Sequence, residues 1–136
     1  MARHRIVLDS GALAYLADKD GALRATIREA LSRRAAVVVP TAVIAEVATG
    51  DRRLDANMNR ALEKTGTVAL DIRIARSAAV LRHAYRQVGA GTVDAVVVAT
   101  ADAVPGSCIL TGDPVDLGLL ASVRGRTRIV SLSEMA

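Results

Sequence analysis

Aromatic side chains are nearly absent from this 136-residue sequence, which has two tyrosines, Tyr15 and Tyr85, and neither Phe nor Trp. Without a row of aromatic rings, the protein lacks the platform on which many RNA-binding folds stack bases. Its core must instead be built from Ala, Val, Leu and Ile. The apolar fraction of 51% and the charged fraction of 24% are typical of an ordinary globular domain.

Cysteine and long hydrophobic runs are also scarce. The single Cys108 excludes a disulfide within the chain and argues against a zinc cluster. The longest apolar run, residues 35–45, is interrupted by Pro40 and is shorter than the roughly 20 residues of a membrane span. No signal-peptide apolar region follows the basic residues 1–5. We therefore expect a cytoplasmic protein without a membrane segment.

The charge balance is mildly basic. There are 18 Lys and Arg residues against 14 Asp and Glu residues, a net charge of +4, and Lys19 and Lys64 are the only lysines. Arginine is the better residue for bidentate contact with phosphate, so the balance is compatible with a nucleic-acid partner without requiring one. The length predicts one domain over residues 1–136.

Short apolar segments alternate with amphipathic ones along the chain. This alternation predicts an α/β fold, with a mostly parallel sheet and helices on both faces. The predicted strands are 5–8, 35–39, 67–70, 107–110 and 127–130. Six predicted helices are 12–16, 21–31, 41–49, 71–88, 92–103 and 114–121, and Thr41 is the expected N-cap of the third. A further helix is expected between 41–49 and the strand 67–70. Gly50-Asp51 would break the chain and cap this helix, and its apolar stripe would be Leu54, Met58, Ala61 and Leu62.

Acidic residues stand in unusual positions for solvated charges. Asp9 ends a buried strand, Glu46 lies within a mostly apolar helix, Asp94 precedes an apolar run, and Asp113 follows another strand, with Asp116 three residues on. Each Asp also has a purely structural interpretation, because Asp often caps helices or complements the helix dipole. A mid-helix carboxylate such as Glu46 gains nothing from capping, so its structural interpretation is the weakest.

Taken together, these acids point to a metal site. Several buried carboxylates cost several kcal/mol each unless positive charge balances them. No Lys or Arg lies in the segments around Asp9, Glu46 or Asp94. Mg²⁺ and Mn²⁺ prefer such oxygen ligands, and they can activate water for attack on phosphorus. The residues alone therefore favour metal-dependent phosphoryl-transfer or hydrolysis chemistry.

Four segments resemble the motifs of PIN-domain nucleases in order and spacing. The segments are 6–13, 40–47, 92–101 and 109–116, and together they extend over most of the chain. The resemblance implies a three-layer α/β/α sandwich and an endoribonuclease that depends on Mg²⁺ or Mn²⁺. A stand-alone domain of this size looks like a VapC-type toxin, dimeric and silenced by a small VapB-like antitoxin.

The resemblance also carries over residue roles. Asp9, Glu46, Asp94 and Asp113 correspond to the metal-binding catalytic acids, and Asp116 to an auxiliary ligand. Ser10 and Thr111 are expected to orient carboxylates or water through hydrogen bonds. The sequence departs from the pattern at Gly11, where the motif more often has Ser or another small side chain.

Arg76, Arg86 and His83 fall on the polar side of the predicted helix 71–88. The two arginines are candidates for binding RNA phosphates, although a solvated outer helix face is the favoured explanation, because charged outer faces are the norm for such helices. A general-base role for His83 is not needed where a metal activates water.

Two other classes of function stay open. The chain could be a PIN-like module that binds RNA or protein without cutting, although such a module is expected to have lost some acids. It could also be a phosphatase or a response-regulator receiver. The first needs an Asp where Gly11 stands, and the second needs a late Lys, which the sequence lacks.

Overall fold

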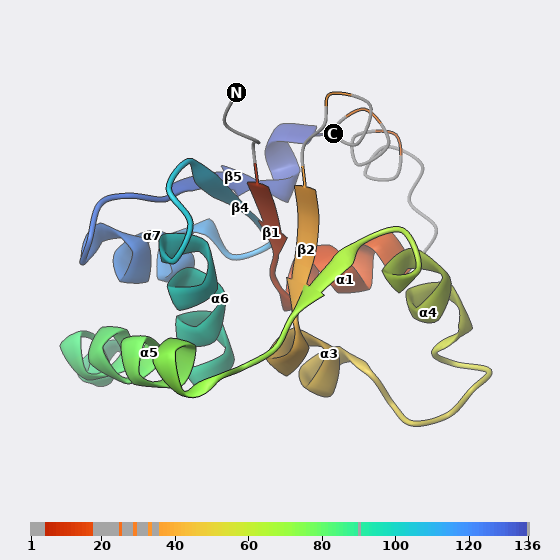
Figure 1. The fold of residues 1–136 in the computed structure, drawn as a ribbon, viewed down its shortest axis with the longest axis horizontal. Coiled ribbons are helices and arrows are strands. Elements are labelled where there is room, and N and C mark those ends of the chain that lie inside the picture. The colour runs from red at the N-terminus through yellow and green to blue at the C-terminus, as the bar shows by residue number, and fades with distance from the viewer. Residues whose placement is uncertain are drawn as a thin grey trace.

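A computed structural model describes residues 5–17, 25, 29, 33, 36–89 and 91–135 (Figure 1). The helix predicted over 21–31 lies, apart from Ala25 and Glu29, outside these residues. Within the described part of the chain, no helix is both long and apolar enough to cross a membrane.

The centre of the fold is a five-stranded parallel sheet with the order β3-β2-β1-β4-β5. The middle strand β1 pairs through Val7 with Val38 on one side and with Ile109 on the other. This sheet confirms the predicted α/β class. The strands are β1 (Arg5–Leu8), β2 (Ala36–Pro40), β3 (Gly66–Val68), β4 (Ser107–Thr111) and β5 (Arg128–Ser131).

Helices lie on both sides of the sheet (Figure 1), with α5 and α6 on one side and α1 and α4 on the other. The helices are α1 (Ser10–Ala17), α3 (Thr41–Val47), α4 (Ala56–Leu62), α5 (Ile72–Ala84), α6 (Thr92–Asp102) and α7 (Pro114–Ser122), with 3₁₀ turns η1 (Arg86–Val88) and η2 (Leu132–Met135). The layers therefore agree with the expected three-layer sandwich.

Helix α6 is the most deeply buried helix of the described structure. Every residue from Ala95 to Asp102 is buried, and the helix contacts β1, β2 and β4. The core around it is aliphatic, because no Phe or Trp is available. Each fully buried Leu or Val contributes about 1.5–3 kcal/mol to folding. This burial holds both ends of α6 in fixed positions relative to the strands.

Helix α1 begins at Ser10 rather than at residue 12, and two later helix starts also differ from the prediction. Thr41 is the first residue of α3 rather than its N-cap, and its Oγ1 instead accepts a hydrogen bond of 3.2 Å from the Leu70 backbone N–H. Leu54 does not belong to the apolar stripe of α4, because the helix begins two residues later and Leu54 is 72% exposed. The turn before α4 is held by Asp51, whose Oδ1 accepts from the Arg53 N–H at 2.8 Å.

Helix α5 ends at Ala84, four residues before the predicted end at Val88. Tyr85 leaves the helical conformation with φ −120°, and its hydroxyl lies 3.0 Å from Ser122 Oγ on α7. The Arg86 guanidinium donates to the His83 carbonyl at 2.9 Å, which satisfies an acceptor freed at the helix end. Asp71, the first residue of the predicted range, is the N-cap of α5 and accepts from the Ile74 N–H at 2.8 Å.

Candidate metal centre

The carboxyl ends of β1 and β4 lie side by side, and each is followed by an acid. Asp9 comes directly after β1, and its backbone N–H donates to the Leu110 carbonyl of β4 at 3.2 Å. Asp113 follows Thr111, the last residue of β4, after Gly112. Because neighbouring parallel strands end at the same edge of the sheet, these two acids are brought to one place.

Asp9 is held in a fixed orientation. Its side chain is buried, with Oδ1 accepting from the Ala12 N–H at 2.8 Å and Oδ2 accepting from the Thr111 hydroxyl. Burial raises the pKa of this carboxyl above its usual value. The hydrogen bonds from Thr111, Ala12 and Gly112 partly oppose that rise, and the charge of Asp113 adds to it. Asp9 therefore caps α1 and also presents a constrained carboxylate at the sheet edge.

Thr111 links the two strand ends. It is fully buried, its hydroxyl donates to Asp9, and its Oγ1 accepts from the Asp113 N–H at 2.8 Å. Asp113 in turn caps α7, with Oδ1 accepting from the Asp116 N–H at 3.3 Å. The capping interpretation of Asp113 is thus correct, and it leaves the other carboxylate oxygen of this exposed side chain uncommitted.

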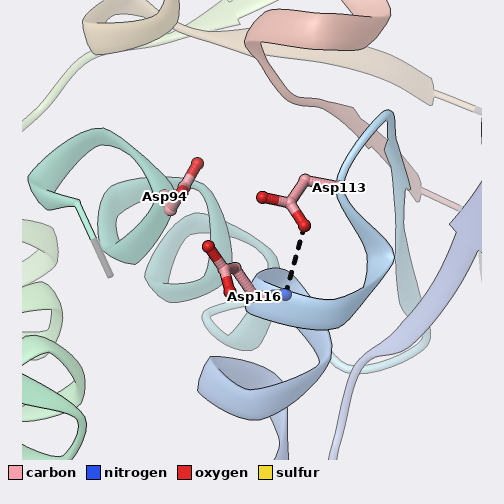
Figure 2. Close-up of side chains that lie close together, drawn as sticks. All are labelled: Asp94, Asp113 and Asp116. Atoms are coloured by element: carbon pink, nitrogen blue, oxygen red, sulfur yellow. Dashed lines mark hydrogen bonds between the residues drawn. The ribbon is translucent and has the colours of Figure 1, made fainter. Parts of the chain in front are cut away.

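Asp94 faces these acids from another element (Figure 2). It lies in the first turn of α6, while Asp113 and Asp116 lie at the start of α7. One carboxylate oxygen from each of Asp94, Asp113 and Asp116 can be chosen so that all lie within 4.8 Å of one another. Asp94 therefore forms one acidic cluster with two residues that lie 19 and 22 positions later in the sequence.

The charges of the two remaining acids act on Asp94, which lies in the cluster. Desolvation is the largest cause of a rise in this pKa to about 6, and the charges of Asp9, Asp113, Glu46 and Asp116 raise it further. Burial raises the pKa of a carboxyl because it disfavours the charged form, and negative charge close by adds to that rise. Asp9 and Glu46 stand outside the three-oxygen cluster, and Glu46 is exposed, but both act on Asp94 electrostatically.

No positive side chain offsets this charge within the described ranges. The ion pairs found there join Arg33 to Glu29 and Arg124 to Asp102, and none involves the five acids. An all-carboxylate set of partly desolvated oxygens is the donor set that hard divalent cations such as Mg²⁺ and Mn²⁺ take. The residues present therefore fit a divalent ion.

Ser10 and Gly11, the two residues that follow Asp9, differ in their surroundings. Ser10 Oγ is buried and has no hydrogen-bond partner in the described structure, so its role in orienting water or a carboxylate stays a prediction. At Gly11, an added Cβ would lie 3.3 Å from the Gly112 N and 3.5 Å from Asp9 Oδ1. The departure from the expected motif at Gly11 thus accompanies a close approach of the two backbones.

Asp102 is a buried acid that sequence reasoning did not single out. Its carboxylate accepts from the Thr127 hydroxyl at 2.7 Å and from Arg124 at 3.4 Å. It is therefore paired, unlike the acids at the other end of α6. No local sequence signal marks this, because Arg124 and Thr127 lie more than twenty residues away.

The residues predicted to bind RNA phosphates lie on the surface, outside the acidic cluster. Arg76, His83 and Arg86 are all exposed. The Arg86 guanidinium is engaged with the His83 carbonyl and lies 3.4 Å from its Nε2. This arrangement fits a solvated helix end, and an RNA-binding role for Arg76 and Arg86 stays a prediction.

A comparison with known families agrees with the four motifs. The sequence profile of the PIN domain matches residues 6–115, which include Asp9, Glu46, Asp94 and Asp113. The chain belongs to the PIN domain family. The resemblance seen in the sequence is thereby confirmed at the level of the family. No curated protein sequence matches this PIN domain significantly.

Solved structures share the fold at low sequence identity. A chain of the VapBC2 complex from Rickettsia felis, bound to a promoter DNA fragment, matches with a TM-score of 0.73 and 12% identity, over 93% of this PIN domain and 98% of that chain. A chain of DNA-bound VapBC from Salmonella typhimurium gives 0.72 and 14%, over 96% and 98%. A chain of a toxin-antitoxin complex from Klebsiella pneumoniae gives 0.64 and 19%, over 92% and 95%.

Proposed function

We propose that this PIN domain is an endoribonuclease that hydrolyses RNA phosphodiester bonds with Mg²⁺ or Mn²⁺. The observation that carries the proposal is the convergence of acids on Asp94, whose pKa rises to about 6 while no cation of the described structure offsets the charge. Such a site gains stability when a divalent ion enters, and RNA supplies a substrate whose phosphates need charge neutralisation.

Asp94, Asp113 and Asp116 would hold the ion, since their oxygens already lie together. Bound there, Mg²⁺ or Mn²⁺ lowers the pKa of a coordinated water and offsets the charge that develops on the phosphate. Asp9 and Glu46 add negative charge that strengthens cation binding. Thr111 fixes the Asp9 carboxylate and the Asp113 backbone relative to each other.

We also propose that the protein is the toxin of a toxin–antitoxin pair. Its structural neighbours come from complexes named VapBC and from a toxin-antitoxin complex, and it covers nearly the whole length of those chains. In this proposal a small VapB-like antitoxin silences the nuclease. The protein acts in the cytoplasm as a homodimer of single-domain chains, each spanning residues 1–136.

A non-catalytic PIN-like binding module is the alternative. The retained acids favour catalysis, because a module that only binds has no use for a desolvated carboxylate cluster that repels phosphate. A binder would hold RNA with an affinity indifferent to Asp9→Asn and would release no product with any metal.

Cleavage of labelled RNA by the purified protein tests the nuclease proposal. We expect cleavage with Mg²⁺ or Mn²⁺, no cleavage in EDTA, and recovery when the metal is added back in excess. Cleavage that continues unchanged in EDTA would exclude the metal-dependent mechanism. For the toxin proposal, expression should arrest growth, and both Asp9→Asn and co-expression of the neighbouring antitoxin gene should relieve the arrest.

Thr111→Val should lower the cleavage rate about 10- to 100-fold, the usual cost of removing a side chain that orients a metal ligand. Valine keeps the shape of threonine but leaves Asp9 without one donor and the Asp113 N–H without its acceptor. Thr100→Val is the matched control, since Thr100 is also buried, its hydroxyl donates to the Val96 carbonyl of its own helix, and it belongs to neither the acidic cluster nor the site around Asp9. Equal activity of the two variants would contradict the role given to Thr111.

A further inference from the structure

A pocket of about 290 Å³ lies at the end of α6 opposite the metal centre. Its walls come from the N-terminal half of α5, the C-terminal end of α6 and the segment that follows α7. The charged and polar side chains among its lining residues are Arg73, Arg124, Arg126, Ser77, Asp71 and Asp102. None of the five acids of the metal centre lines it.

One guanidinium of the pocket is held in place by buried partners. Arg124 Nη1 donates to Asp102 Oδ2 at 3.4 Å, and Arg124 keeps a side-chain exposure of 24%. Asp102 is itself fixed, because its Oδ1 accepts from the Thr127 hydroxyl at 2.7 Å. A guanidinium has five N–H donors, so Arg124 retains donors for a ligand after this contact.

The other two arginines have no protein partner in the described structure. Arg73 and Arg126 are exposed and form no ion pair or hydrogen bond through their side chains with the residues described. Asp71 also lines the pocket, but its carboxylate accepts from the Ile74 N–H as the cap of α5. Three cations against two engaged carboxylates leave a net positive pocket with free guanidinium donors.

The position of the pocket suits a nucleic-acid strand. Asp94 and Asp102 are eight residues apart on α6, which is roughly 12 Å along the helix axis at 1.5 Å per residue. An RNA strand spans that distance in a few nucleotides. Without its ion the acidic cluster repels phosphate groups, so cations elsewhere on the surface would strengthen the attraction for the strand.

We propose that this pocket binds a backbone phosphate of the RNA that is cut at the metal centre. The inference rests on the proposed nuclease function and assigns it a second contact, made by Arg73, Arg124 and Arg126. Arginine suits the task because its planar donors bind phosphate oxygens in a bidentate manner.

Binding of a labelled single-stranded RNA of about ten nucleotides, measured in EDTA so that cleavage does not interfere, tests the proposal. The double substitution Arg73→Ala and Arg126→Ala should weaken binding at least about tenfold at low salt, as expected for loss of charge-assisted hydrogen bonds. It should also reduce the slope of log affinity against log salt by about 1.4, the value for two phosphate contacts on a single strand.

The matched control is the double substitution Arg52→Ala and Arg53→Ala, which removes the same charge from exposed side chains that do not line the pocket. We expect its effect to be much smaller. Lysine at positions 73 and 126 should restore the salt slope but only part of the affinity. Circular dichroism confirms that each variant is folded.

Equal weakening by the two alanine pairs would overturn the proposal, because only net charge would then matter. It would also be overturned if RNA binding stayed unchanged while binding of poly-glutamate fell, since the pocket would then suit a protein partner. The binding assay needs no catalysis. Failure of the pocket proposal would appear in RNA binding in EDTA, whereas failure of the nuclease proposal would appear in the cleavage assay with metal.

Discussion

Replacing Asp94 by Asn is expected to reduce metal-dependent RNA cleavage roughly a thousandfold or more while the protein stays folded. Asn has the same shape but carries no charge, so the cluster loses the carboxylate on which the other four acids converge. The measurement is the initial rate of RNA cleavage with saturating Mg²⁺ or Mn²⁺.

Glu63→Gln is the control for this substitution. Glu63 is an exposed acid just after α4, outside the acidic cluster, and its neutralisation changes the net charge by the same amount. We expect it to cleave RNA at the wild-type rate. If Asp94→Asn also kept that rate, the acids would not form the catalytic site.

The second large effect concerns stability. Without metal, Asp94→Asn should make the protein more stable than the wild type at pH 8, by on the order of 1 kcal/mol after allowance for solvent screening. The folded state raises the pKa of Asp94 from its ordinary value of 3.8 to about 6, so it disfavours the ionised form. In the wild type, the free energy of unfolding is therefore highest below the unfolded-state pKa, where Asp94 is protonated. This stability is lost as the pH rises through about 6.

The difference in stability between Asp94→Asn and the wild type should therefore disappear as the pH falls from 8 to 4. Thermal unfolding of both proteins at pH 8 and at pH 4 measures this difference. Added Mn²⁺ should reverse the order at pH 8. A ligand at a hundred times its Kd stabilises the wild type by about 2.7 kcal/mol, whereas the variant has lost a ligand. A constant difference between the two proteins at every pH, with no response to metal, would contradict the electrostatic description of the site.

The sequence was sufficient to predict the layers of the fold and the positions of the acids. The apolar strand before Asp9 and the apolar strand before Asp113 fixed both residues at the carboxyl edge of a parallel sheet. Spacing and resemblance pointed to Asp94 and Glu46 as well. Their roles as metal ligands stay proposals. The structure places Asp94 in the cluster with Asp113 and Asp116, and the charge of Glu46 helps to raise the pKa of Asp94.

What the sequence did not predict depends on contacts between distant residues. Helix α5 ends at Ala84 where Tyr85 turns toward Ser122, 37 positions later, and no local pattern specifies that hydrogen bond. The predicted range 41–49 was also too long. Helix α3 ends at Val47, Ala48 is extended, and the Thr49 N–H donates to the Asp55 carboxylate. Asp116 was predicted as an auxiliary ligand, yet it lies in the tightest part of the cluster.

The arginine pocket was also invisible in the sequence. Arg73, Arg124 and Arg126 come from segments about fifty residues apart, and their spacing matches no motif. Only the packing of α5 against α6 and the buried Asp102 bring them to one pocket.

The proposed nuclease function requires a divalent cation to bind among the carboxylates of the acidic cluster. Anomalous diffraction from crystals of the protein soaked in Mn²⁺ measures this most directly. We expect an anomalous peak within bonding distance of carboxylate oxygens of Asp94, Asp113 and Asp116, and no such peak in Asp94→Asn crystals. A well-ordered soaked crystal with no peak there would contradict it.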